Sequence, residues 1–153
     1  MFLPEPALIT GEPMLLAGIR RRHKMSEAAV TIPQQWEEFR AHPWRHERAP
    51  RAFGVFCSAT DQVLEYMTAI EVESFDEVPG DMGRMRVPTQ RYAMFAFEEH
   101  VSKVAAAWER IWTAWLPGSG YEDAETPAFE LYDLKFDPAT GDGGFEIWFP
   151  IRR

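Results

Sequence analysis

The feature that most constrains this fold is an internal repeat, because the order strand, helix, strand, strand is predicted twice along the chain. The first half gives strands over residues 14–20, 52–59 and 64–72, with a helix from about Thr31 to His42. The second half gives strands over residues 90–97, 129–136 and 145–151, with a helix over 101–115. With an acidic connector over 73–83, the repeats cover about 13–73 and 84–153 of a single 153-residue domain.

This pattern predicts an α+β fold made of two βαββ units related by a pseudo-two-fold axis, with antiparallel sheets and two main helices. Residues 64–70 align with residues 145–151, and this alignment places Glu65 on Glu146. A cleft between repeats is a frequent place for a ligand. We therefore expect a central ligand cleft that both acids face.

The last predicted strand, Phe145 to Ile151, carries the most informative side chains. Its alternation places four apolar residues on one face, and Glu146, Trp148 and Pro150 on the other. A carboxylate beside an aromatic ring suits a cationic, partly apolar ligand, which brings the counter-charge and can stack on the ring. The alternative is a glutamate on a solvated face or paired with a neighbouring basic residue.

Composition narrows the class of protein. Hydrophobic residues make up 46% of the chain and aromatic residues 14%, enough for a sizeable core and an aromatic-lined pocket. The formal net charge of -8 argues against nonspecific binding to nucleic acid or to anionic membranes. With one cysteine, no membrane-spanning apolar run and no signal-peptide pattern at the N-terminus, the sequence predicts a cytoplasmic protein without an internal disulfide.

Several motifs of the second half resemble a known family. In order they are Gln90–Phe95, the helix with Trp108, Ile111 and Trp112, the segment Trp115–Tyr121, then Pro127–Tyr132 and Phe145–Ile151. Together they resemble the gyrase-inhibitor-like (GyrI-like) small-molecule-binding domain, which is the effector-binding domain of AraC- and MerR-type multidrug-responsive activators. The resemblance covers nearly the whole chain, although the first half matches mainly in layout.

The resemblance implies a pocket for bulky, often cationic and aromatic compounds. An acid on the last strand anchors such ligands in the family, and Glu146 holds that position here. Aromatic side chains form the walls, and the candidates in this chain are Trp36, Tyr66, Trp108, Trp112, Tyr121, Tyr132 and Trp148. Core packing is the alternative role for each ring.

The chain departs from the family's regulators, because no helix-turn-helix precedes the domain. We therefore expect a stand-alone effector-binding protein, similar to members carried on mobile gene cassettes, that binds neither DNA by itself nor a membrane. A role in transcription would need a protein partner. A second departure is Phe97-Glu98-Glu99-His100, where many relatives have a His-x-Gly sequence.

Two other functions remain open on the sequence. One is a hydrolase of reactive small molecules, in which Glu146 with Tyr66, Tyr121 or Tyr132 activates water. The other is a protein-binding inhibitor whose acidic surface acts on a target such as gyrase. We assign no catalytic residue, no cofactor and no metal site, because Pro43 interrupts the spacing of His42 and His46 and no phosphate-binding glycine loop is present.

Overall fold

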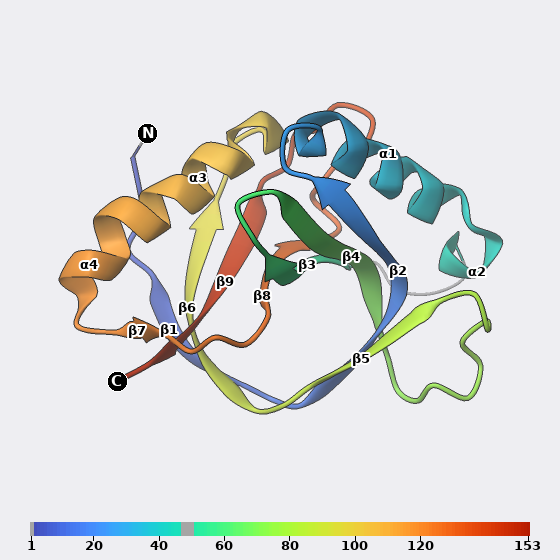
Figure 1. The fold of residues 1–153 in the computed structure, drawn as a ribbon, viewed down its shortest axis with the longest axis horizontal. Helices are drawn as coiled ribbons and strands as arrows, with labels where there is room; N and C mark the ends of the chain where they lie inside the picture. Colours follow the sequence, from blue (N-terminus) through green and yellow to red (C-terminus); the bar gives the residue numbers. More distant parts are fainter. Residues whose placement is uncertain (1, 47–50) are drawn as a thin grey trace. The chain divides into compact units, whose positions relative to one another are not determined.

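The structure is a computed structural model that describes residues 2–46 and 51–153. The chain forms two compact units. Unit 1 contains residues 2–12 together with Thr89–Arg153, and unit 2 is Pro13–Pro88. The α+β class, with antiparallel sheets and two main helices, is confirmed (Figure 1).

Within its described residues, unit 2 forms an antiparallel sheet in the order β5-β2-β4-β3. Its elements are β2 (Met14–Lys24), α1 (Ala28–Ala41), α2 (Pro43–His46), β3 (Ala52–Ala59), β4 (Val63–Val72) and β5 (Gly83–Val87). Figure 1 shows α1 lying along β2. Beneath α1, a core cluster forms from Ala17, Ile19, Phe39, Trp44, Ile70, Val78 and Met82.

Unit 1 has the corresponding strand order, β1-β6-β9-β8, and is also antiparallel. Its strands are β1 (Ala7–Gly11), β6 (Gln90–Phe97), β7 (Glu122–Asp123, paired with β9), β8 (Ala128–Tyr132) and β9 (Phe145–Arg152). Its helical segments are η1 (Val101–Lys103), α3 (Val104–Arg110), η2 (Ile111–Trp115) and α4 (Leu116–Ser119). In both units the last long strand, β4 or β9, pairs with the strands before and after the helix.

Local side-chain bonds explain where the elements differ from the prediction. Helix α1 begins at Ala28 rather than near Thr31, and the Thr31 hydroxyl donates back to the Glu27 carbonyl instead of capping the helix. Strand β8 ends at Tyr132 rather than at Phe136 because Asp133 starts a turn, in which its carboxylate accepts from the Lys135 N–H.

The altered loop before the second helix has a capping role. His100 Nδ1 accepts from the Ser102 backbone N–H at 3.1 Å, and His100 also contacts the Thr140 carbonyl oxygen through Nε2 at 2.7 Å. The helix that follows runs to Ser119, four residues beyond its predicted end. Gly120 then ends it at φ +81°, a left-handed conformation that favours glycine.

Candidate ligand-binding site

Strand β9 sorts its side chains between the two faces of the unit 1 sheet. One face carries Phe145, Ile147, Phe149 and Ile151, all of them buried. This confirms the core face that the alternation predicts. Glu146 and Trp148 lie on the other face and are half-buried. Glu146 therefore keeps contact with solvent while standing next to apolar surface.

Trp148 contacts Glu146, and aromatic rings from the two neighbouring strands pack on Trp148. Trp148 Nε1 donates to Glu146 Oε1 at 2.9 Å. The Trp148 ring stacks on Phe129 of β8 and meets Tyr92 of β6 edge-on, both with centroids 5.5 Å apart. Phe129 pairs with Trp148, and Tyr92 with Pro150, so these side chains share one side of the sheet. We call Tyr92, Phe129, Glu146 and Trp148 the Glu146 face.

The electrostatics of the Glu146 face combine one carboxylate with apolar surroundings. Burial raises the pKa of Tyr92 to about 12, so its phenol stays neutral at physiological pH. Tyr92 and Phe129 were not among the predicted site residues. The register between strands could have identified them, because the strands that pair with β9 place Phe129 opposite Trp148 and Tyr92 opposite Pro150.

The opposite face of the same sheet holds a second carboxylate, Glu130, which the prediction missed. Glu130 is only 4% exposed, and it accepts from Trp108 Nε1 and from the Tyr132 hydroxyl, each at 2.8 Å. Register places Glu130 opposite Ile147 and therefore across the sheet from Glu146. The alternation of Phe129-Glu130-Leu131-Tyr132 could have indicated that Glu130 and Tyr132 share a face.

This arrangement separates Trp108 and Tyr132 from the Glu146 face. Both side chains bond Glu130, which joins α3 to the sheet. Tyr132 is thus hydrogen-bonded to a different carboxylate from the one with which the hydrolase hypothesis pairs it. A buried carboxylate needs such donors, since burying a charge without them is costly.

The helical segment after α3 carries Trp112, and Tyr121 follows it along the chain. Trp112 meets Phe149 edge-on at 5.0 Å but stays 47% exposed. Tyr121 stacks on Trp115, with ring planes 15° apart and centroids 6.3 Å apart. Arg153 lies over the Tyr121 ring at 5.6 Å. The Tyr121 ring thus contacts the cationic side chain of Arg153.

In unit 2 the structure brings Trp36 and Tyr66 together. Trp36 Nε1 donates to the Tyr66 hydroxyl at 3.1 Å, and the two rings meet edge-on at 6.3 Å. Tyr66 is 1% exposed and also packs against Phe56 at 5.2 Å. This pair belongs to the packing between α1 and β4.

Glu65 is held in ion pairs. Its Oε1 lies 2.7 Å from Arg20 Nη2, and its Oε2 lies 3.4 Å from Arg22 Nε. The hydrogen bond from Arg20 is the main cause that lowers the pKa of Glu65 below its ordinary value of 4.5. A cationic ligand at Glu65 would have to compete with two arginines.

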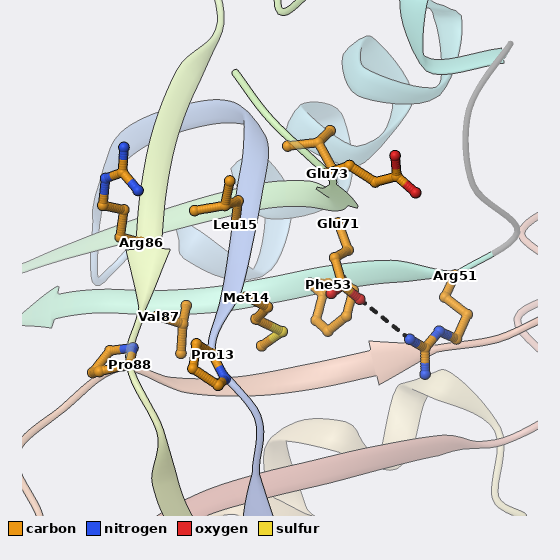
Figure 2. A pocket seen from close by; sticks show the side chains of 11 residues that line it. Pro13, Met14, Leu15, Arg51, Phe53, Glu71, Glu73, Arg86, Val87 and Pro88 are labelled. Atoms are coloured by element: carbon orange, nitrogen blue, oxygen red, sulfur yellow. Dashed lines mark hydrogen bonds and ion pairs between the residues drawn. The ribbon is translucent and has the colours of Figure 1, made fainter. Parts of the chain in front are cut away.

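A cavity of about 1050 Å³ opens at one end of the unit 2 sheet (Figure 2). Apolar side chains, including Met14, Phe53 and Val87, line most of it. Figure 2 shows Arg51 paired with Glu71 at 3.4 Å on one side of the cavity and Arg86 on the other. None of the nine predicted site residues lines this cavity, so it is a second candidate location for a ligand.

Neither a metal centre nor a membrane-spanning helix is found in the part of the chain that the structure describes. Within residues 2–46 and 51–153, no group of three or more His, Cys, Asp or Glu side chains is placed to hold a metal ion. The side chain of His46 lies outside the described residues. Every helix in these ranges is too short or too polar to cross a membrane.

The fold agrees with that of a defined class of ligand-binding domain. The model of the family described as "GyrI-like small molecule binding domain" matches residues 4–152. The chain therefore belongs to the GyrI-like small molecule binding domain family.

The chain is similar in sequence to a transcriptional regulator and to a DNA gyrase inhibitor. Transcriptional regulator BrlR of Pseudomonas aeruginosa is 29% identical over 127 residues, which are 79% of this chain and 46% of BrlR. The chain thus spans about half the length of that relative. A DNA gyrase inhibitor of Erwinia billingiae is 26% identical over 138 residues, 86% of this chain and 88% of that protein.

Solved structures show the same fold at low sequence identity. SAV2435 bound to tetraphenylphosphonium has a TM-score of 0.78 and 19% identity, covering 97% of this chain and 94% of that one. Integron cassette protein VCH_CASS2 of Vibrio cholerae has a TM-score of 0.73 and 14% identity, covering 99% and 98%. The C-terminal domain of EcmrR has a TM-score of 0.65 and 16% identity, covering 100% and 99%.

Proposed function

We propose that this chain binds cationic, amphipathic aromatic small molecules, with Glu146 as the counter-charge and the half-buried Trp148 ring as the stacking surface, which the buried rings of Tyr92 and Phe129 support. The observation that carries the proposal is the half-buried Glu146 carboxylate, which bonds Trp148 beside two further rings. A cation near both a carboxylate and aromatic faces is stabilised by charge pairing and by the ring quadrupoles. Partial burial strengthens both interactions relative to water.

The family and one structural relative support this ligand class. The family is described by small-molecule binding, and SAV2435 was solved with the lipophilic aromatic cation tetraphenylphosphonium. That ligand combines a delocalised positive charge with four phenyl rings. It is therefore a suitable first probe for the Glu146 face.

The other predicted residues differ in how directly they are proposed to contact the ligand. Trp148 contacts the ligand, and Trp36, Tyr66, Trp108, Trp112, Tyr121 and Tyr132 are proposed to shape or support its surroundings. Glu65 is proposed as the weaker anchor, because Arg20 and Arg22 already neutralise it. The central cleft, the stand-alone role and the cytoplasmic location stay predictions from the sequence.

A thermal-shift comparison tests the proposal. A ligand that binds only the folded state raises the melting temperature. Tetraphenylphosphonium should stabilise the wild type, and the effect should fade in Glu146→Gln, which keeps the shape of the side chain but removes its charge. The neutral compound triphenylphosphine oxide serves as the ligand control.

A control variant for Glu146→Gln can be made in the cavity of unit 2. Glu73 lines that cavity and has no ion-pair partner among the described residues, so Glu73→Gln removes one accessible carboxylate there. The proposal expects Glu73→Gln to retain the stabilisation by tetraphenylphosphonium. If tetraphenylphosphonium failed to stabilise Glu73→Gln but still stabilised Glu146→Gln, the cation site would lie in the cavity of Figure 2. That result would refute the role of Glu146.

The gyrase inhibitor relative favours a second candidate function, in which the acidic chain acts on a protein target. This function predicts inhibition of gyrase supercoiling that persists in Glu146→Gln and in the presence of saturating tetraphenylphosphonium. A chain without effect on supercoiling at any concentration would eliminate it.

A further inference from the structure

A smaller cavity in unit 1 has the opposite electrical character from the Glu146 face. It encloses about 470 Å³ where the end of β1, the start of β6 and the end of β9 meet. Its lining consists of Thr10, Thr89, Gln90, Arg91, Tyr121, Ile151, Arg152 and Arg153. Three of these residues are arginines and none is acidic, although the chain as a whole has a net charge of -8. We call it the arginine cavity.

Strand pairing fixes the backbone of the arginine cavity. Thr10 pairs with Arg91 in the β1–β6 ladder, so a hydroxyl and a guanidinium start from adjacent strands. Gln90 donates through Nε2 to the carbonyls of Arg91 and Ile151, which ties β6 to β9 at this point. Most of the lining residues therefore stand on or beside paired strands rather than on a loose loop.

Two of the three guanidinium groups are held in place by neighbours. Arg153 lies over the Tyr121 ring at 5.6 Å, and Tyr121 itself stacks on Trp115. A guanidinium over a ring leaves the N–H groups at its edge available to an acceptor. Arg152 pairs with Glu122 at 3.3 Å and lies 3.9 Å from Glu125. This positioning lowers the entropy lost when a ligand binds.

The third group, Arg91, has no counter-charge among the described residues. Its side chain makes no hydrogen bond or ion pair with any residue in that part of the chain. Arg152 is already neutralised by Glu122, but Arg91 and Arg153 have no carboxylate partner among the described residues, and an anion that enters the cavity can supply the missing counter-charge. Arginine is also the side chain whose planar fork matches the oxygens of a phosphate group.

We propose that the arginine cavity binds the phosphate group of a small molecule. Arg91 and Arg153 supply charge-assisted hydrogen bonds, and the hydroxyls of Thr10 and Thr89 supply neutral donors. A volume of about 470 Å³ has room for a phosphate monoester as well as for free phosphate. The site shares no residue with the Glu146 face, and Tyr121 is the one lining residue that is also proposed to support the surroundings of the cation.

Calorimetric titration at fixed ionic strength tests this proposal with two probes, inorganic phosphate and phenyl phosphate. We expect saturable binding to the wild type that weakens by about tenfold in Arg91→Gln and in Arg153→Gln, since each removes a charge-assisted hydrogen bond. Saturation by both probes assigns the site to phosphate itself, and saturation by phenyl phosphate alone assigns it to a monoester. Both outcomes support the proposal.

The matched control is Arg110→Gln, which removes the same charge from the exposed end of α3, outside the cavity. Arg110→Gln and Glu146→Gln should bind phosphate like the wild type. No saturable binding of either probe to the wild type would overturn the proposal. An equal loss of phosphate affinity in Arg110→Gln and Arg91→Gln would also overturn the proposal, because such a result would indicate a general effect of net charge.

Discussion

At the scale of single residues, the two aligned glutamates have different surroundings. Glu65 is neutralised by Arg20 and Arg22, whereas Glu146 accepts a hydrogen bond from the indole N–H of Trp148. Their alignment follows from the repeat, but their roles depend on the partner strand. Glu65 lies opposite Arg22 of β2, while Glu146 lies opposite Ala96 of β6.

The Glu65 ion pairs give the first prediction. Because the pKa of Glu65 is lowered in the folded state, its contribution to stability is present above the ordinary carboxyl pKa and is lost as pH falls through the lowered value. Glu65→Gln should cost about 0.5–1 kcal/mol of unfolding free energy at pH 7, since Arg20 is 43% exposed and solvent screens the pair. Urea denaturation at neutral and at strongly acidic pH measures this.

The exposed pair of Arg21 and Glu38 is the control for that experiment. Its side chains are 49% and 54% exposed, so Glu38→Gln should change stability less than Glu65→Gln. A Glu65→Gln defect of the same size at acidic pH as at pH 7 would show that the ion pairs are not its cause.

The buried Glu130 gives the second prediction. Trp108→Phe removes an N–H donor from a buried carboxylate and should destabilise the protein by about 1.5–3 kcal/mol. Trp112→Phe makes the same chemical change at a half-exposed position and should cost less than about 1 kcal/mol. Chemical denaturation compares the two variants, and equal losses would contradict a special role for the Trp108–Glu130 hydrogen bond.

At the scale of elements, hydrophobic periodicity predicted the long strands and both helices because these have one clearly buried face. It did not predict β1 and β5, which are short strands at the outer ends of the two pairing orders. β5 alternates Arg with Met and Val, and β1 is largely exposed, so neither carries a strong apolar signal. Edge strands are identified by their partners rather than by their own pattern.

The second helix shows a different limit of periodicity. The sequence predicted one uninterrupted helix over residues 101–115. The segment Ile111–Trp115 is instead a π-helical turn, whose hydrogen bonds span five residues and shift the phase of the side chains. Ile111 is buried while Trp112 is 47% exposed.

Close pairing of β2 and β4 gives the third prediction. A Cβ atom at Gly18 would clash with the Thr68 carbonyl oxygen and would lie 2.7 Å from Ala69 Cα. Gly18→Ala therefore forces the two strands apart and should lower the unfolding free energy by about 1–3 kcal/mol or more.

Gly80 provides the control, because a Cβ atom there meets nothing within 4 Å. Gly80→Ala should stay within about 0.5 kcal/mol of the wild type, measured by the same thermal or urea unfolding. A Gly18→Ala protein as stable as Gly80→Ala would show that β2 and β4 do not pair this closely.

At the scale of the whole molecule, the repeated layout was the most predictable property. Each unit places its last long strand between the strands that flank its helix, as the duplicated βαββ pattern requires. The limits of the units were less predictable, because β1 precedes the first repeat in sequence but pairs with β6 of unit 1. A sequence pattern does not carry such long-range pairing.

The candidate site was predictable only in part for the same reason. The alternation of β9 marked Glu146 and Trp148, which lie within one strand. Tyr92 and Phe129 lie beside Trp148 because of the register between neighbouring strands. Trp108 and Tyr132 bond Glu130, which lies on the other face of the sheet. Residue types alone therefore did not indicate which side chains share a face.

The central claim is that Glu146 discriminates charge, and the most direct measurement is the dissociation constant of tetraphenylphosphonium and of triphenylphosphine oxide for the wild type and for Glu146→Gln. We predict that the variant binds the cation about 10- to 100-fold more weakly, equivalent to about 1.4–2.7 kcal/mol, and binds the neutral compound within about twofold of the wild type. The same loss for both compounds, or an unchanged affinity for the cation, would contradict the account.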